Sequence, residues 1–509
     1  MNAIRRMSVL LLVFVGSLSA TLLGQRRPDP LRGLDQYIEK AMRDWNVPGL
    51  AIAIVKDDSV VYSRGFGVRE VGKPGRVDEN TLFAVASNTK AFTATAVTML
   101  AVENKLSLND PVTRYLPDWQ LSDPWATREA TLRDLLTHRM GYLTWQGDLV
   151  WYGSTYDRAE VIRRMRFLKP ATSFRSAYGY SNYGFLTAGE IVAKLSGMSW
   201  DEFVRNHFFD PLGMTRTNTS VTALAGMDNV AMPHTKIDDT IVVVPYRIVD
   251  NAGGAATINS SVADMSRWIR LQLANGMWNG RQLVDSTAIR LTRTPQFTLP
   301  IGSWTRAHFP STHFSSYGLG FFLRDYRGRL LVMHDGGMDG MLSQLGMLPE
   351  EHLGVIILTN YDDQTLFQAL LFRVLDLYLG APVTDWSQVY IERDRGSPPE
   401  AEAAAIAGTH PSLDLAGYAG RYTNSLYGTA AVTVDGGQLH IALQAHPRLT
   451  GTLEHWQYDT FRATLEDRYV GKPLVTFTLD ESGRVRDFRV SIRPDFVDPL
   501  EYVFERERQ

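Results

Sequence analysis

Three short motifs in the chain combine residue types that can carry out nucleophilic catalysis. The first is Ser87-Asn88-Thr89-Lys90, the only Ser-x-x-Lys among the 509 residues. Residues at i and i+3 share one face of a helix, so the hydroxyl and the amine can meet. A serine hydroxyl is a weak nucleophile until a neighbouring base takes its proton. Lysine becomes such a base when burial lowers its pKa from about 10.4 to about 7, at roughly 4–5 kcal/mol.

The other two motifs are Tyr180-Ser181-Asn182 and His334-Asp335-Gly336, the latter followed by Gly337. Each pattern occurs a second time, as Tyr422-Thr423-Asn424 and His352-Leu353-Gly354. The context separates the pairs. Tyr180 opens a predicted helix, and His334 ends an apolar strand that runs into two glycines, whose backbone N–H groups can face a ligand. The second copies lie in a small β region and at a hairpin tip, which favours a structural role for them.

The elements around these motifs alternate between strand and helix patterns. Apolar strands are predicted at Leu50–Val55 and Val60–Val68, and again at Tyr317–Leu323, Leu330–Met333, Leu342–Leu348 and Gly354–Thr359. Helical periodicity covers Leu31–Asn46, Ser87–Glu103, Leu132–His138, Arg158–Arg166, Tyr183–Leu195, Trp200–His207, Ser261–Ala274, Ser286–Arg293 and Leu366–Leu379. Strands at both ends of this region predict a sheet assembled from the two ends, flanked by helices.

The C-terminal part of the sequence differs in character. We predict a first domain over 31–385 and a linker over 386–411, where Gly, Ser and Pro precede a Glu/Ala run. The remaining segment, 412–509, contains short strands between Gly, Asn and Asp residues, among them Ala430–Val434 and Leu474–Leu479. This pattern predicts a small all-β barrel or sandwich.

Composition excludes several classes of function. Lys and Arg total 52 against 55 Asp and Glu, which argues against a nucleic-acid partner. The chain has 0 Cys, so it holds no thiolate nucleophile and no zinc–cysteine site. Its His residues are scattered without ligand spacing, and no Gly-x-Ser-x-Gly or nucleotide-binding glycine pattern occurs. We therefore expect no metal and no cofactor.

The N-terminus reads as a targeting segment. Arg5 and Arg6 precede an uncharged run over Met7–Gly24 that holds the small residues Ser17 and Ala20. This predicts a signal peptide over 1–24, with an uncleaved anchor as the alternative. We expect a periplasmic or extracellular protein with no further membrane span.

Together, the three motifs resemble the serine β-lactamase and penicillin-binding-protein family, especially its class C β-lactamase and esterase branch. They occur in that family's order, and flanking segments agree, namely Leu135–Gly141, Ala252–Gly254, Asp264–Trp268 and Met341–Asn360. The resemblance covers about 31–379. It implies a β-lactamase/DD-peptidase fold of the α/β (α+β) class, in which helices flank an antiparallel sheet. The segment after Tyr418 resembles the lipocalin-like domain that some of these hydrolases carry.

This resemblance implies roles for the motif residues. Ser87 would be the acylated nucleophile, Lys90 its base, and Tyr180 the proton carrier to and from the leaving group. Backbone N–H groups of Ser87 and Gly337 would form the oxyanion hole. Substrate contacts would come from Asn182, which also binds Lys90, and from His334, Gly336 and Gln146.

One departure from the family pattern concerns charge. His334 stands where β-lactamases carry a lysine, and free histidine is mostly neutral near pH 7. The site therefore lacks a positive charge for a substrate carboxylate, which disfavours antibiotic hydrolysis. We expect an exported serine hydrolase that acts on esters, amides or small peptides, D-amino-acid peptides included. The alternatives are a class C-type β-lactamase, a D-Ala-D-Ala carboxypeptidase and a non-catalytic penicillin-binding sensor. The sequence leaves open a homo-oligomer and an apolar ligand inside the barrel.

Overall fold

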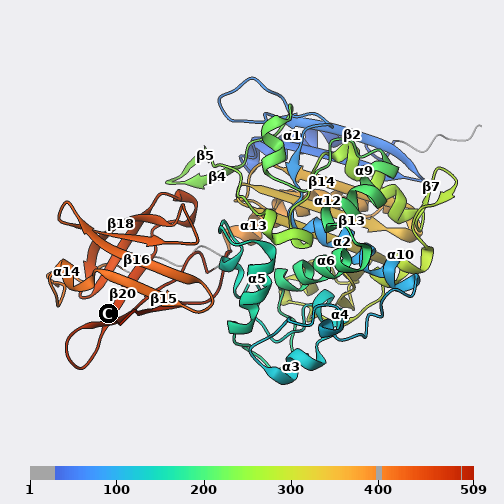
Figure 1. Cartoon of the computed structure of the whole chain (residues 1–509). Coiled ribbons are helices and arrows are strands. Elements are labelled where there is room, and N and C mark those ends of the chain that lie inside the picture. The colour runs from blue at the N-terminus through green and yellow to red at the C-terminus, as the bar shows by residue number, and fades with distance from the viewer. Residues whose placement is uncertain (1–28, 397–403, 495, 509) are drawn as a thin grey trace, which may run out of the picture.

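The computed structural model describes residues 29–396, 404–494 and 496–508. They form a large domain of one sheet covered by helices and a C-terminal barrel at its side (Figure 1). This arrangement confirms the predicted fold class. The predicted signal peptide at 1–24 lies outside the described residues.

An eight-stranded sheet in the order β2-β1-β14-β13-β12-β11-β10-β9 forms the centre of the large domain. β1 pairs antiparallel with β14, with Ile52 opposite Ile357, so both ends of the domain's sequence meet in one sheet, as predicted. The strands are β1 (Gly49–Lys56), β2 (Ser59–Gly67), β9 (Phe297–Thr298), β10 (Ser315–Tyr317), β11 (Phe322–Tyr326), β12 (Arg329–Met338), β13 (Met341–Leu348) and β14 (Leu353–Thr359). Small two-stranded ladders join β3 (Phe83–Ala84) to β6 (Asn259–Ser260), β4 (His234–Ile237) to β5 (Thr240–Val243), and β7 (Met277–Trp278) to β8 (Arg281–Gln282).

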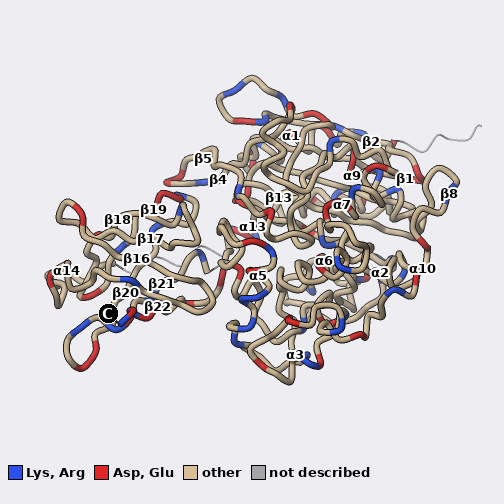
Figure 2. Tube along the Cα trace, viewed as in Figure 1, with Lys and Arg blue, Asp and Glu red and all other residues tan. Residues whose placement is uncertain are grey.

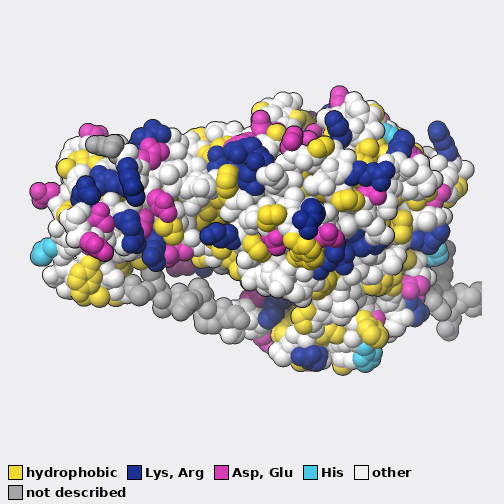
Figure 3. Space-filling view, turned by 60° about the horizontal axis from the view of Figure 1, so that its bottom comes forward, with side chains coloured by type: hydrophobic (Ala, Val, Ile, Leu, Met, Phe, Trp, Pro, Cys, Tyr) yellow, Lys and Arg dark blue, Asp and Glu magenta, His cyan; other side chains and the backbone are white. Residues whose placement is uncertain are grey.

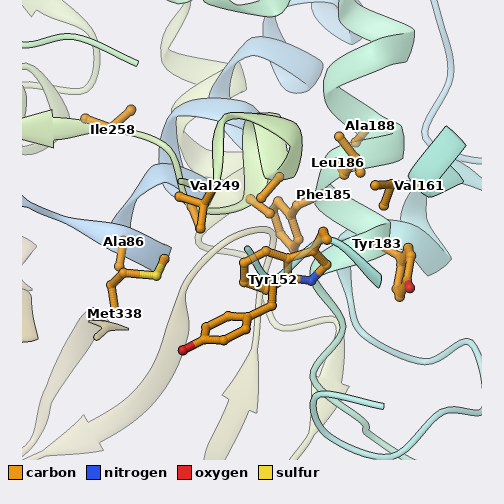
Figure 4. Close-up of a cluster of buried hydrophobic side chains, with 14 of the residues drawn as sticks. Ala86, Tyr152, Val161, Tyr183, Phe185, Leu186, Ala188, Val249, Ile258 and Met338 are labelled. Carbon is orange, nitrogen blue, oxygen red and sulfur yellow. The ribbon is translucent and has the colours of Figure 1, made fainter. Parts of the chain in front are cut away.

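Successive side chains of β1 point to opposite faces of the sheet, so this strand contributes to two cores, each covered by its own helices. Leu50, Ile52 and Ile54 belong to a core with α1 (Leu34–Asp44), α12 (Leu366–Leu379) and α13 (Trp386–Arg395). Ala51 and Ala53 belong to the other core, which contains α2 (Thr89–Val102), α6 (Asn182–Ser196) and α9 (Val262–Leu273). Figure 4 shows part of this second core, with Ala86, Phe185 and Met338 drawn from a turn, a helix and a strand.

The remaining helices are short, and side-chain caps mark where several of them begin. Thr131 and Asp134 form a capping box at α4, and Ser199 and Glu202 form another at α7. These helices are α3 (Pro124–Glu129), α4 (Leu132–Leu136), α5 (Arg158–Arg164), α7 (Trp200–Val204), α8 (Asp210–Leu212), α10 (Ser286–Thr292), α11 (Ser303–His308) and α14 (Leu415–Tyr418).

Two strand predictions next to the motifs were wrong. The expected strand Tyr317–Leu323 is broken into β10 and β11, because the chain turns at Gly320 with φ 77°. A Cβ on Gly320 would lie 2.7 Å from the Lys90 carbonyl oxygen, so this turn lets the sheet approach α2. The other strand does not end before His334. It continues to Met338, and β11 pairs with it only as far as Met333, which leaves its last five residues without a partner on that edge.

The segment predicted as a linker begins with a helix that packs on the large domain. α13 places Trp386 against Phe309, with the two rings stacked at 4.8 Å between centroids. Trp386 also donates a hydrogen bond from its indole nitrogen to Asp376 of α12. These contacts join the first ten residues of the segment to the large domain.

The C-terminal domain is a closed barrel of eight antiparallel strands. They are β15 (Gly420–Asn424), β16 (Gly428–Asp435), β17 (Gln438–Leu443), β18 (Thr450–Gln457), β19 (Thr460–Leu465), β20 (Leu474–Leu479), β21 (Val485–Val490) and β22 (Tyr502–Arg506). Buried aromatic rings fill the interior: Tyr422, Phe461, Phe477 and Phe488 are each at most 4 % exposed and contact one another. An interior packed in this way argues against the apolar-ligand alternative for the barrel.

Charged residues of both signs are spread over both domains (Figure 2). On the face shown in Figure 3, Lys and Arg side chains stand among Asp and Glu, and hydrophobic side chains form separate small patches. Within the described ranges, no helix combines the length and apolar character needed to cross a membrane.

Candidate active site

Ser87 lies in the turn that connects β3 to α2. The turn is one 3₁₀ segment, η1 (Ala86–Asn88), and Ala86 adopts a left-handed backbone with φ 47°. A non-glycine residue in this region stores about 1–3 kcal/mol of strain and persists only where surrounding packing imposes it. Ala86 is buried. The turn presents Ser87 at the start of α2, where its side chain lines a cavity.

Lys90 is fully buried one helical turn after Ser87. Its Nζ lies 3.1 Å from Ser87 Oγ, 2.7 Å from Asn182 Oδ1 and 2.9 Å from the Ala255 carbonyl oxygen. Burial lowers its pKa to about 7, against the opposing charges of Asp148 and Asp335. A neutral amine has two N–H groups and one lone pair. Since the amide and carbonyl oxygens can only accept, they take both N–H groups, and the lone pair faces Ser87.

Tyr180 brings a second hydroxyl to the nucleophile. Its ring lies 4.7 Å from Lys90 Nζ and stacks on the His138 ring with centroids 4.3 Å apart. Burial raises its pKa well above the usual value, although nearby Ser87 opposes this rise. The hydroxyl has no hydrogen-bond partner of ordinary geometry in the described part of the chain. Tyr180 is therefore protonated at neutral pH, and its hydroxyl can donate to a substrate.

Asn182 connects Lys90 to a carboxyl group that the sequence did not point to. Its Nδ2 donates to Asp148 Oδ2 at 2.5 Å, which directs its Oδ1 toward Lys90. Asp148 is fully buried, and burial raises its pKa to about 8. Lys90 and Asp148 thus form a coupled pair in the same pH range. No local pattern marks Asp148, because its importance comes from contacts with a helix 34 positions further along the chain.

His334 lies close to the motif residues but is neutral. Its Nε2 lies 3.2 Å from the Tyr317 hydroxyl and its Nδ1 lies 2.5 Å from the Asp335 carbonyl oxygen. Burial, together with the Lys90 charge, lowers its pKa to about 3. Both ring nitrogens are occupied, and His334 does not line the cavity that holds Ser87. The structure places this residue behind Tyr180 as a packing partner, not as a contact for substrate.

The two glycines of the third motif let β12 approach the nucleophile. A Cβ on Gly336 would lie 2.3 Å from the Val85 carbonyl oxygen and 3.0 Å from the Ser87 backbone nitrogen. Only glycine fits there, so Gly336 has a steric role. Gly337 lines the cavity beside Ser87, on the unpaired edge of β12. Its position is compatible with an oxyanion hole formed with the Ser87 N–H.

Gln146 lies outside the site, contrary to the expectation of a substrate contact. It is 3 % exposed, its Oε1 accepts from the Leu143 N–H, and its Nε2 donates to the Lys169 carbonyl. Because its amide group is bonded to the backbone at Leu143 and Lys169, Gln146 holds these two segments together.

The cavity over Ser87 has a volume of about 300 Å³ and mainly aromatic walls. No Lys or Arg lines it, and its acidic neighbours are Asp148 and Asp335. Within the described part of the chain, no three His, Asp or Glu side chains gather as metal ligands. The lining residues are Ser87, Thr144, Trp145, Asp148, Trp151, Tyr152, Tyr178, Tyr180, Asn182, Ala256, Phe322, Asp335, Gly337, Met338, Phe496 and Val497.

The large domain matches a model of a known protein family. The family model described as Beta-lactamase matches residues 34–378. The chain belongs to the beta-lactamase family. Within this beta-lactamase family domain lie all three motifs, and a second model, a domain of unknown function named DUF3471, matches residues 404–505, the barrel.

Individual relatives agree with this assignment. The chain is 29 % identical to Unguisins hydrolase ungD of Aspergillus violaceofuscus over 91 % of this chain and 88 % of the relative. It is 25 % identical to Protein flp of Staphylococcus aureus over 66 % of this chain and 64 % of the relative. Among solved structures, the octameric penicillin-binding protein homologue from Pyrococcus abyssi matches with a TM-score of 0.63 and 23 % identity, covering 93 % of this chain and 100 % of that one. These findings make this beta-lactamase family member a serine hydrolase.

Proposed function

We propose that the protein hydrolyses neutral esters, amides or small peptides that carry an apolar acyl group, through an acyl-enzyme on Ser87. The observation that carries this proposal is the environment of Lys90. Two acceptors occupy its N–H groups, burial lowers its pKa to about 7, and its lone pair faces Ser87 Oγ at 3.1 Å. A general base works best when its pKa is near the working pH.

Acylation proceeds by transfer of one proton around the site. Lys90 takes the Ser87 proton as Oγ bonds to the substrate carbonyl carbon, and the oxyanion accepts hydrogen bonds from the Ser87 and Gly337 N–H groups. The Tyr180 hydroxyl then gives its proton to the leaving oxygen or nitrogen and regains one from Lys90. The acyl–leaving-group bond breaks, and the leaving group departs neutral. Water repeats these steps in reverse to release the acid.

The cavity walls support apolar, uncharged substrates. A volume of about 300 Å³ is at the small end of the range for ligand pockets, and its aromatic lining suits an apolar group. A substrate carboxylate would find no Lys or Arg among the lining residues to neutralise its charge. This disfavours the β-lactamase and D-Ala-D-Ala carboxypeptidase alternatives. The ungD relative carries the word hydrolase in its name, which supports turnover over a sensor role.

Mass spectrometry of the intact protein tests this proposal. The protein is mixed separately with a fluorophosphonate, penicillin G and a phenylacetate ester. We expect stoichiometric labelling by the fluorophosphonate, turnover of the ester and little penicilloyl adduct. Ser87→Ala removes all labelling, whereas Ser107→Ala, a change at an exposed serine beyond the other end of α2, leaves it intact. Absence of fluorophosphonate labelling would refute the proposal.

We also propose that the protein is exported and that it forms a homo-oligomer. The signal peptide predicted over 1–24 supports a periplasmic or extracellular location, and the octameric state described for the Pyrococcus abyssi homologue supports a homo-oligomer. N-terminal sequencing of the protein from the culture fractions tests the first. Light scattering of the purified protein tests the second.

A further inference from the structure

The barrel reaches the catalytic cavity through the 496–500 segment, which connects β21 to β22. Phe496 lies 6.1 Å from the Trp145 ring, centroid to centroid, and a Cβ on Gly337 would lie 3.7 Å from its ring. Val497, which is 2 % exposed, lines the same cavity. Two side chains of the second domain therefore line the cavity that holds the nucleophile.

Asp498 fixes this segment against the large domain. It is completely buried, and its Oδ2 accepts from the Tyr427 hydroxyl at 2.9 Å within the barrel and from the Leu149 N–H at 3.4 Å across the interface. Leu149 follows Asp148 directly, so the same short stretch carries a catalytic-site carboxyl and the anchor for the barrel.

A buried ion cluster holds the two domains together near the cavity. Arg247, 5 % exposed, donates from Nε to Asp339 of the large domain at 2.7 Å and from another nitrogen to Asp467 of the barrel. Asp339 follows the cavity-lining Met338 and also accepts from the Tyr152 hydroxyl at 2.6 Å. Removal of one partner would leave the remaining buried charges less well compensated, which would destabilise the docked position.

From this arrangement we propose that the barrel, which a domain model of unknown function matches, sets the acyl-group selectivity of the hydrolase. Phe496 and Val497 form the wall that limits the size of the apolar acyl group bonded to Ser87. The inference rests on the proposed function, since it concerns the acyl group of that same reaction. It gives the C-terminal domain a direct part in substrate choice, whereas its own interior is filled by aromatic side chains.

The test measures kcat/KM for two series of neutral esters, one with acyl groups from acetyl to naphthoyl and one with varied leaving groups. We expect Phe496→Ala to raise the ratio of kcat/KM for the naphthoyl ester to kcat/KM for the acetyl ester at least about ten-fold. Apolar pockets discriminate by about 10–200-fold per methylene. Val497→Phe should lower that ratio. The matched controls Phe314→Ala and Val503→Phe, at side chains 74 % and 38 % exposed, should leave it unchanged.

A second measurement separates this inference from the proposed function. In the Ser87→Ala background the ester is not consumed, so calorimetry can measure binding of the naphthoyl ester with and without Phe496→Ala. If the wild-type protein is not acylated, the proposed function fails, but tighter binding in the double variant still supports the wall. An unchanged acyl-size ratio with intact fluorophosphonate labelling overturns the inference, as does a change confined to the leaving-group series.

Discussion

Replacing Asp148 by Asn should move the acidic limb of the kcat/KM profile to lower pH. Lys90 must be neutral to act as the base, and burial lowers its pKa to about 7, so activity on a neutral ester should fall about ten-fold per pH unit below 7. The Asp148 charge opposes this lowering. Asn keeps an acceptor oxygen for Asn182 Nδ2, so the substitution removes charge and preserves the hydrogen bond.

The size of the shift follows from the contacts. Lys90 Nζ bonds to Asn182 at 2.7 Å and Asn182 bonds to Asp148 at 2.5 Å. With the width of one amide between them, the two charges are about 7 Å apart, which is worth about 2 kcal/mol at an effective dielectric constant near 20. That corresponds to about 1.5 pH units as an upper value. Because burial raises the Asp148 pKa to about 8, this group is only about one-tenth ionised at pH 7, so the observed downward shift should be about a few tenths of a pH unit.

Steady-state kinetics with a neutral ester as substrate, measured between pH 5 and 9, locate the acidic limb of the kcat/KM profile. The exposed Asp239→Asn is the matched control and should leave the profile in place. A limb that moves upward in Asp148→Asn, or downward by more than the upper value of about 1.5 pH units, would refute this account of the electrostatic link between Asp148 and Lys90.

Three further outcomes follow from the site and the interface. Ser87→Ala should lower ester turnover by several orders of magnitude, because nucleophile and base act as a unit; retention of more than a few per cent would contradict the assignment. Burial lowers the pKa of His334 to about 3, so this residue stays neutral from pH 5 to 9. His334→Gln should therefore leave the acidic limb of the kcat/KM profile at the same pH. In the wild-type protein, acylation by penicillin should be no faster at pH 5 than at neutral pH. Asp467→Asn leaves Arg247 paired with Asp339 and weakens one charged hydrogen bond, so it should destabilise the docked barrel by about 1.5–3 kcal/mol, seen in calorimetry as an earlier, separate transition. The same single transition as in the exposed control Asp435→Asn would argue against the ion cluster.

The sequence was sufficient for features that depend on local periodicity. The pairing of Ser87 with Lys90 needs only one helical turn, and the two-ended sheet follows from apolar strands at either end of the domain. Features set by distant contacts were not predictable. β12 continues past His334 because β13 supplies a ladder up to Met338, and no local signal in the sequence indicates this.

The same reasoning explains the residues that were missed or misassigned. Asp148, Arg247 and Phe496 gain their importance from neighbours that are tens to hundreds of positions away in the chain. The neutrality of His334 results from burial, which a three-residue motif cannot express. Gln146 matched a family position by type alone, and the backbone groups of Leu143 and Lys169 use its amide.

The filled interior of the barrel has a consequence for how this enzyme could diversify. Eight strands and their aromatic core carry the stability of that domain, whereas Phe496 and Val497 lie outside these strands, in the connection between β21 and β22. Natural or engineered substitutions at Phe496 and Val497 would then alter the range of acyl groups that the enzyme accepts. The catalytic serine, lysine and tyrosine would stay unchanged. Loop libraries at these two positions are a direct route to tailored acyl hydrolases built on one unchanged reaction centre.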